Sequence, residues 1–134
     1  MSNNEQKFRK MWNWIAKKTE DTWTRIEEED FFRHEEEESD FWGYPQRPFH
    51  RSFACEEARE RCIKAGEDPA DYRSLCKYCP VVWSKDVNPK EIWDASLLCY
   101  REGGLSQWGY AYHWDEIPEA IEWAEKFSQL DWVD

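Results

Sequence analysis

Several of the signals that usually announce an enzyme or a membrane protein are missing from this chain of 134 residues. It has no Gly-rich phosphate-binding loop, no HExxH motif and no GxSxG motif, so the common nucleotide, metalloprotease and serine-hydrolase sites are not expected. No run of about 18 apolar residues occurs, so we expect no membrane-spanning helix. The first residues lack a basic segment followed by an apolar one, which predicts no signal peptide and a cytoplasmic protein with reduced cysteines.

Apolar character is also low on average, with a mean hydropathy of -1.02. Such a value alone would indicate disorder. However, aromatic residues make up 17% of the chain and include ten Trp. Each buried aromatic side chain removes about 150–250 Å² from water, so we expect residues 1–134 to form one compact domain.

The charge is strongly of one sign, at -11, and it is unevenly spread. Residues 1–26 carry six basic and three acidic side chains, whereas residues 27–40, EEEDFFRHEEEESD, carry nine acids and only Arg33. This balance disfavours direct binding to nucleic acid and favours a partner protein with a basic surface. Aromatic residues follow the acidic run, so the predicted partner-binding residues are Glu35, Glu36, Glu37, Glu38, Trp42 and Tyr44.

Hydrophobic spacing predicts a mainly α fold of about four to five short helices with aromatic-rich loops. Residues 1–28 form the first, amphipathic helix in this prediction, 29–54 form an acidic and then aromatic loop, and 55–134 form a helical body clamped by cysteines. The first helix has an apolar face of Phe8, Met11, Trp12, Ile15, Thr19, Trp23 and Ile26. The body is predicted to contain helices over 56–65 (ended by Gly66), 69–76 (capped by Asp68), 89–102 (ended by Gly103-Gly104) and from Pro118, with 80–83 extended and 105–114 a strand or aromatic loop.

Five cysteines occur in the second half of the chain, two of them in the sequence CxxC. A structural zinc ion needs about four ligands, with sulfur at roughly 2.3 Å. Cys55 and Cys62 are seven residues apart, which on one helix separates them by about 10 Å along the axis, so both cannot bind one ion unless Cys55 lies outside the helix. We therefore predict a zinc site formed by Cys62, Cys76, Cys79 and Cys99, with Cys55 as the substitute for Cys62 or Cys99.

Other interpretations of these residues stay open. Small buried thiols without metal are the main alternative, and His50 and His113 are weaker ligand candidates. A thioredoxin-like role is rejected, because the CxxC follows a helix rather than a strand. His113 beside Asp115 and Glu116 lacks a partner nucleophile, so we predict no catalytic residue and no enzyme activity.

Three motifs appear in order along the chain: Lys10-Met11-Trp12-Asn13-Trp14-Ile15-Ala16, Cys76-Lys77-Tyr78-Cys79-Pro80-Val81-Val82-Trp83, and a closing helix that ends near Trp132. Together they resemble a group of small bacteriophage proteins without an established activity. Those proteins have an N-terminal LWxWI-type helix, two cysteine knuckles of which the second reads CxxCPxxW, and a further cysteine. This chain departs from the group where Cys55 and Cys62 replace the first CxxC, and where Asp131 replaces a proline.

The resemblance implies a phage-encoded protein that acts in the host cytosol. With the acidic charge, it leads to the hypothesis of a non-enzymatic protein that binds and inhibits or modulates a host protein, for example by mimicking nucleic acid. The alternative hypothesis is a small zinc-stabilised module associated with nucleic acid, since residues 1–26 are basic and aromatic. A third is an enzyme that uses the cysteines or His113.

Overall fold

The computed structural model describes residues 3–27, 53–83, 99 and 105–133. Over these ranges the chain forms five helices and no named strand, so the predicted mainly helical fold is confirmed for them. None of these helices combines the length and the apolar character needed to cross a membrane. Their bounds are α1 Asn3–Thr22, α3 Phe53–Lys64, α4 Tyr72–Lys77, α5 Leu105–His113 and α6 Ile117–Ser128.

Several predictions fall on residues outside the described ranges. They are the helix over 89–102 with its stop at Gly103-Gly104, the acidic segment beyond Glu27, and the predicted loop over 29–54 as far as residue 52. The predicted end of that loop is slightly wrong, because α3 already begins at Phe53.

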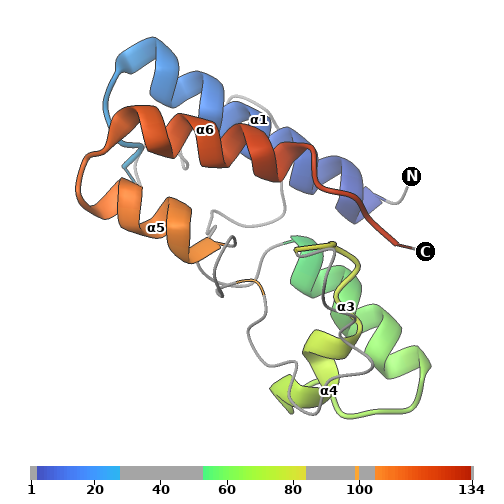
Figure 1. Cartoon of the computed structure of the whole chain (residues 1–134). Helices are drawn as coiled ribbons and strands as arrows, with labels where there is room; N and C mark the ends of the chain where they lie inside the picture. Colours follow the sequence, from blue (N-terminus) through green and yellow to red (C-terminus); the bar gives the residue numbers. More distant parts are fainter. Residues whose placement is uncertain (1–2, 28–52, 84–98, 100–104, 134) are drawn as a thin grey trace.

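Helices α1 and α6 form the most extensive helix pair and lie side by side, with α5 against α6 (Figure 1). The predicted apolar face of α1 is confirmed from Phe8 to Thr19, all of which is buried. The helix ends at Thr22 rather than at residue 28, because Trp23 has a φ of 53°. Trp23 is consequently exposed, whereas Ile26 is buried from the segment after the helix.

Trp12 lies at the centre of the core, fully buried between three elements. Its ring meets Phe127 of α6 at 4.9 Å and Trp108 of α5 at 5.2 Å, both edge to face. Ala120 and Ala124 of α6 are also buried, and their small side chains let α1 approach closely. The predicted last helix is confirmed with this apolar face.

The prediction of a strand or loop over 105–114 is wrong, because these residues form α5. Leu105, Trp108 and Ala111 recur at three-residue spacing and are its buried residues. Trp108 and Tyr112, four apart, stack at 5.0 Å. The aromatic side chains at even positions match the alternation of a strand. The same segment also has apolar residues at helical spacing.

Helix α3 ends as predicted at Gly66, whose φ is 79°. The amide of Gly66 donates to the carbonyl of Ile63 at 2.9 Å, and that of Glu67 donates to Cys62 at 3.1 Å, which is a Schellman ending. The predicted cap of the next helix is displaced. Asp68 accepts from the amide of Ala70 in a turn, and α4 begins later, with Asp71 as the N-cap accepting from Arg73.

The segment after α4 is extended, as predicted, and it pairs with the tail that follows α6. Val81 and Trp132 form an antiparallel bridge. The amide of Val82 donates to Asp131 at 2.9 Å, and that of Val133 donates to Pro80 at 2.8 Å. This pairing fixes the residues next to Cys79 against the α1–α6 core.

Candidate binding pocket and cysteine cluster

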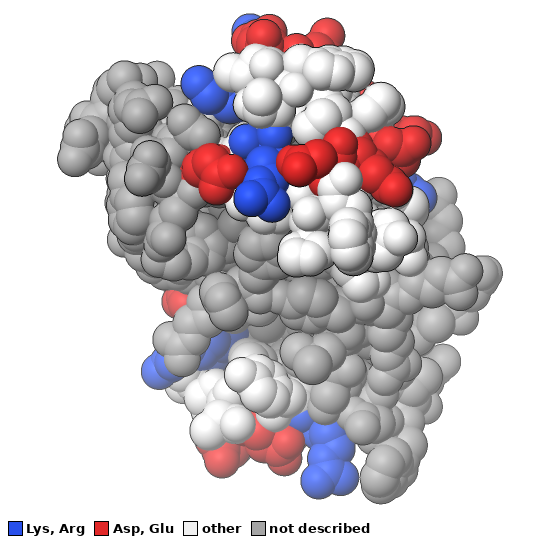
Figure 2. Space-filling model, turned by 90° about the vertical axis from the view of Figure 1, so that its left-hand side faces the viewer, with Lys and Arg blue, Asp and Glu red and all other residues white. Residues whose placement is uncertain are grey.

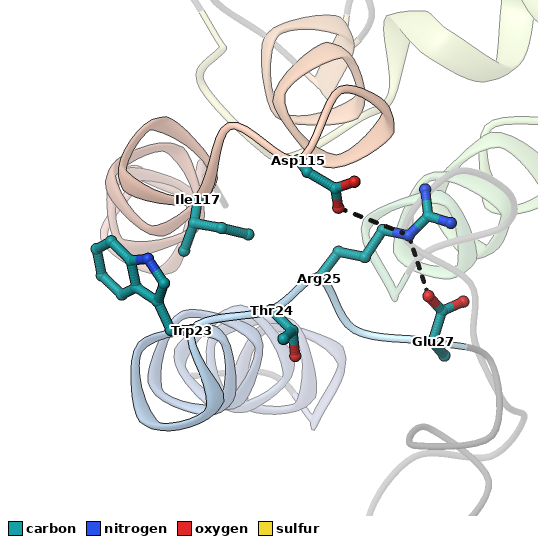
Figure 3. Close-up of a pocket in the computed structure, with 6 residues that line it drawn as sticks. All are labelled: Trp23, Thr24, Arg25, Glu27, Asp115 and Ile117. Atoms are coloured by element: carbon teal, nitrogen blue, oxygen red, sulfur yellow. Dashed lines mark hydrogen bonds and ion pairs between the residues drawn. The ribbon is translucent and has the colours of Figure 1, made fainter.

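A pocket of about 630 Å³ opens where the end of α1 meets the turn between α5 and α6 (Figure 3). Its lining comes from two stretches far apart in the sequence, one following α1 and one that runs from the α5–α6 turn to Ile117, the first residue of α6. The volume falls within the range of small-ligand sites, although the pocket is open to solvent. The lining residues are Trp23, Thr24, Arg25, Glu27, Asp115 and Ile117.

Backbone strain is concentrated at this pocket. Among the described residues, Trp23 and Asp115 are the non-glycine residues with positive φ, at 53° and 54°. Each ends a helix: the amide of Trp23 donates to Thr19 at 2.8 Å, and Asp115 occupies the position in α5 that Gly66 occupies in α3. A left-handed residue with a Cβ costs roughly 1–2 kcal/mol, and such strain clusters at functional sites.

One guanidinium lies between two carboxylates inside the pocket (Figure 3). Nε of Arg25 donates to Glu27 at 3.0 Å and lies 3.8 Å from Asp115. The guanidinium also lies over the ring of Tyr112 at 5.5 Å. The hydrogen bond to Glu27, with the charges of Glu27 and Asp115, raises the pKa of Arg25. The pocket therefore has two acids to one base.

Acidic residues continue from the pocket along α6. Residues 105–133 contain six acids and one Lys, a net charge of -5. Glu116, Glu119, Glu122 and Glu125 of this set are exposed. Figure 2 shows acidic side chains on both sides of a basic group on this end of the molecule, beside uncharged surface.

Exposed aromatic side chains occur at the same end. Trp23 is 58% exposed and Trp114, directly before Asp115, is 61% exposed. Tyr110, also exposed, lies 6.3 Å from Trp114, and the His113 ring meets Trp114 edge to face at 5.0 Å. Large aromatic side chains on the surface favour a binding role, because Trp and Tyr dominate interface energetics.

None of the five cysteines lines this pocket, and none of them forms a disulfide. The charges of Cys55, Cys76 and Cys79 each contribute to raising the pKa of Cys99, although its burial is the largest cause. Among the described residues, no three Cys, His, Asp or Glu side chains form a group that could already hold a metal ion, so the predicted cysteine clamp is not confirmed.

Cys62 is the predicted ligand from the last turns of α3. It is buried at the far end of α3 from Cys55. Burial raises its pKa, and the further contributions come from Glu67, Asp68 and Asp71 rather than from thiols. The selection of Cys62 over Cys55 stays a prediction, because the one-helix argument did not indicate which of the two faces the CxxC.

Burial and hydrogen bonds act in opposite directions on the pKa of Cys79. Burial raises its pKa to about 12, while hydrogen bonds from the Val81 amide and the Trp83 indole oppose this shift. The Trp83 Nε1 is buried and reaches no acceptor at full hydrogen-bond geometry among the described residues. In this environment a neutral thiol is a poor nucleophile.

The predicted partner-binding residues Glu35, Glu36, Glu37, Glu38, Trp42 and Tyr44 lie outside the described residues. The pocket residues Trp23 and Asp115 were not predicted. Trp23 counted as a core position of a longer helix, and nothing in the sequence marks a helix end that lacks glycine. In the sequence, the exposed acids of α6 contributed to the overall net charge but were not predicted as a separate acidic surface.

No protein-family model, curated protein or solved structure matches this chain in a comparison with known proteins.

Proposed function

We propose that this chain is a non-enzymatic binding protein that holds a basic segment of a partner protein at the pocket between α1 and the α5–α6 turn. The main support for the proposal is that Trp23 and Asp115, both strained by a positive φ, line the same pocket. Trp23 supplies exposed aromatic surface there, and Asp115 supplies negative charge. Helix ends of this kind usually have glycine, as α3 does. A Trp and an Asp at these helix ends have a conformational cost. A role in binding explains why they occur there.

Charge complementarity supports a basic partner. The pocket has Glu27 and Asp115 against Arg25, and the adjoining surface of α6 is acidic. An ionised carboxylate accepts about four hydrogen bonds, so each acid can receive a partner cation besides the Arg25 contact. The resulting attraction speeds association and weakens with salt.

Aromatic surface supplies the second part of the recognition. Trp23 lines the pocket and Trp114 adjoins it, and the faces of indole rings attract Lys and Arg side chains. Such contacts contribute about 0.5–2 kcal/mol each. The resemblance to small bacteriophage proteins makes a host protein with a basic surface the partner that we propose, and inhibition or modulation of that protein the outcome.

The other hypotheses have less support. A thiol enzyme needs a cysteine with a lowered pKa, whereas burial raises the pKa of Cys79. A nucleic-acid module needs a basic surface, and the described part of the first segment, residues 3–27, has only six bases against four acids.

The test is the binding of a fluorescent peptide of alternating Lys and Gly to the full chain, followed by anisotropy at low and at physiological salt. We expect Trp23→Asn to weaken binding by roughly 30-fold, the loss of a hot spot of about 2 kcal/mol. Asn tolerates positive φ, so this change keeps the helix ending. Asp115→Asn, which removes only a charge, should weaken binding several-fold and lessen the dependence on salt.

Matched controls separate the pocket from general attraction. Tyr72→Asn removes an equally exposed aromatic from α4, and Glu60→Gln removes one exposed acid from α3, outside both the pocket and the acidic surface of α6. Both should bind within about twofold of the unchanged chain. Equal losses in the pocket and control variants would refute the pocket as the site. Binding of an oligonucleotide instead of the basic peptide would support the nucleic-acid hypothesis.

A further inference from the structure

Arg25 lines the proposed binding pocket and has the same charge as the partner that the pocket is proposed to bind. We propose that its guanidinium is an internal competitor: it occupies the place that an arginine side chain of the partner takes, and binding displaces it. This inference rests on the proposed function, because it concerns the same pocket. It identifies the partner residue as an arginine and gives the pocket an autoinhibitory contact.

The contacts of Arg25 are those with which proteins recognise a guanidinium. Its Nε donates to Oε1 of Glu27 at 3.0 Å and lies 3.8 Å from Oδ1 of Asp115 (Figure 3). The guanidinium carbon also lies 5.5 Å from the centre of the Tyr112 ring. Carboxylates pair with arginine, and the face of an aromatic ring attracts its planar cation. The pocket therefore already holds a guanidinium, which comes from the chain itself.

These contacts are weak enough to be exchanged for others. The side chains of Arg25, Glu27 and Asp115 are 37%, 57% and 66% exposed, so water screens both ion pairs. The 3.8 Å contact to Asp115 is too long for a hydrogen bond. Both contacts run through Nε, at the side of the guanidinium. A partner arginine that approaches end-on can direct two N–H groups at one carboxylate, and such bidentate pairs are stronger.

Displacement requires only the side chain of Arg25 to move. The next residue, Ile26, is buried in the core at 2% exposure and fixes the backbone at this point. Arg25 itself is partly exposed, and rotation about its Cα–Cβ bond swings the guanidinium by several ångströms into solvent. Glu27 and Asp115 then face the partner without the charge of Arg25, which increases the attraction for a cation.

A structural link is the alternative role of Arg25, because its contacts join the segment after α1 to Asp115 and Tyr112. The two roles predict opposite effects of Arg25→Gln, which removes the guanidinium. Loss of a structural link would loosen the pocket and weaken the binding of a basic peptide. Loss of an internal competitor strengthens that binding, because the two carboxylates no longer have to exchange one cation for another.

The test compares two fluorescent peptides by anisotropy with the full chain, one of alternating Arg and Gly and one of alternating Lys and Gly. We expect the unchanged chain to bind the Arg peptide at least about threefold more tightly, because Lys lacks the planar fork. Arg25→Gln should strengthen binding of the Arg peptide by roughly three- to fivefold, as expected for the release of exposed ion pairs.

Lys126→Gln is the matched control. It also removes one exposed positive charge, from α6 beside its acidic residues and outside the pocket. It should change the affinity for the Arg peptide by less than about twofold. An increase equal to that of Arg25→Gln would overturn the internal competitor, because net charge alone would then explain both results.

The NMR resonance of the Arg25 Nε–H gives a readout on the unchanged chain, which does not depend on the folding of a variant. We expect the Arg peptide to shift this resonance towards the position of a solvent-exposed arginine, since its hydrogen bond to Glu27 is lost. A role as a structural link would leave the hydrogen bond in place. Peptide binding without a shift of this resonance would therefore overturn the displacement.

Failure of this inference can be told apart from failure of the proposed function. If Trp23→Asn weakens binding but Arg25→Gln does not strengthen it, the pocket remains the binding site and the internal competitor is overturned. Equal binding of the Arg and Lys peptides would overturn the assignment of the partner residue as arginine. If Trp23→Asn and the control Tyr72→Asn bind equally well, the proposed function fails, and this inference fails with it.

Discussion

Replacement of Trp12 by alanine tests whether the core is arranged around this residue. Its side chain is fully buried, and its ring lies edge to face with Phe8 at 6.5 Å, Trp108 at 5.2 Å and Phe127 at 4.9 Å. The substitution removes a side chain that contacts rings from α1, α5 and α6 together. Each of those rings would then face a cavity.

The expected loss follows from these contacts. Truncation of a buried Trp or Phe to Ala costs about 3–5 kcal/mol. Edge-to-face pairs add roughly 0.5–1.5 kcal/mol each beyond area burial, and three are lost here. We therefore expect the upper end of the range, about 5 kcal/mol. Since domains of this size unfold at about 5–15 kcal/mol, Trp12→Ala would leave little or no net stability.

The assay is urea unfolding followed by far-UV circular dichroism, because ten Trp complicate fluorescence. Trp12→Phe, which keeps a smaller ring, should cost about 1–3 kcal/mol and stay measurable if the alanine variant does not fold. Trp114→Ala is the control, because it removes the same side chain from an exposed position and should change the stability by less than about 0.5 kcal/mol. A loss below about 1 kcal/mol for Trp12→Ala would refute the central role of Trp12.

Two further predictions concern titration and helix capping. The stability should fall as the pH rises above about 9, because the unfolded chain loses the Cys79 proton near 9.0 and the folded chain only near 12. This corresponds to at most about 4 kcal/mol, with Cys99 acting in the same direction, and urea midpoints that stay constant between pH 8 and 11 would contradict it. Asp71→Ala should cost about 1 kcal/mol by loss of the α4 cap, and Asp68→Ala clearly less, measured by thermal unfolding. The reverse order would indicate that the helix begins at Asp68.

Elements whose signals agree with their packing could be predicted from the sequence. The α1 face and the last helix have apolar residues at helical spacing, and Gly66 ends α3 at a positive φ. The prediction of secondary structure failed in α5, where the sequence fits both a strand pattern and a helix pattern. In α5 the alternating aromatics suggested a strand, and the packing of Trp108 against Trp12 is a tertiary contact that no local pattern contains.

The candidate sites were less predictable because they depend on helix ends and on facing directions. Spacing showed that Cys55 and Cys62 could not share an ion, but which of them faces the CxxC depends on how α3 packs. The pocket depends on α1 ending at Thr22, several residues before its apolar pattern ends. Trp23 and Asp115 become neighbours only when the α5–α6 turn folds against that end.

The pairing of α1 with α6 also determines when the chain can fold. The two helices begin more than 100 residues apart, at Asn3 and Ile117, so α1 cannot cover its apolar face until α6 has left the ribosome. Contacts between distant parts of the sequence slow folding, because a long loop must close before they form. During synthesis the side chains of Phe8, Met11 and Trp12 therefore lack their native partners, and we expect the nascent chain to depend on chaperones that shield them.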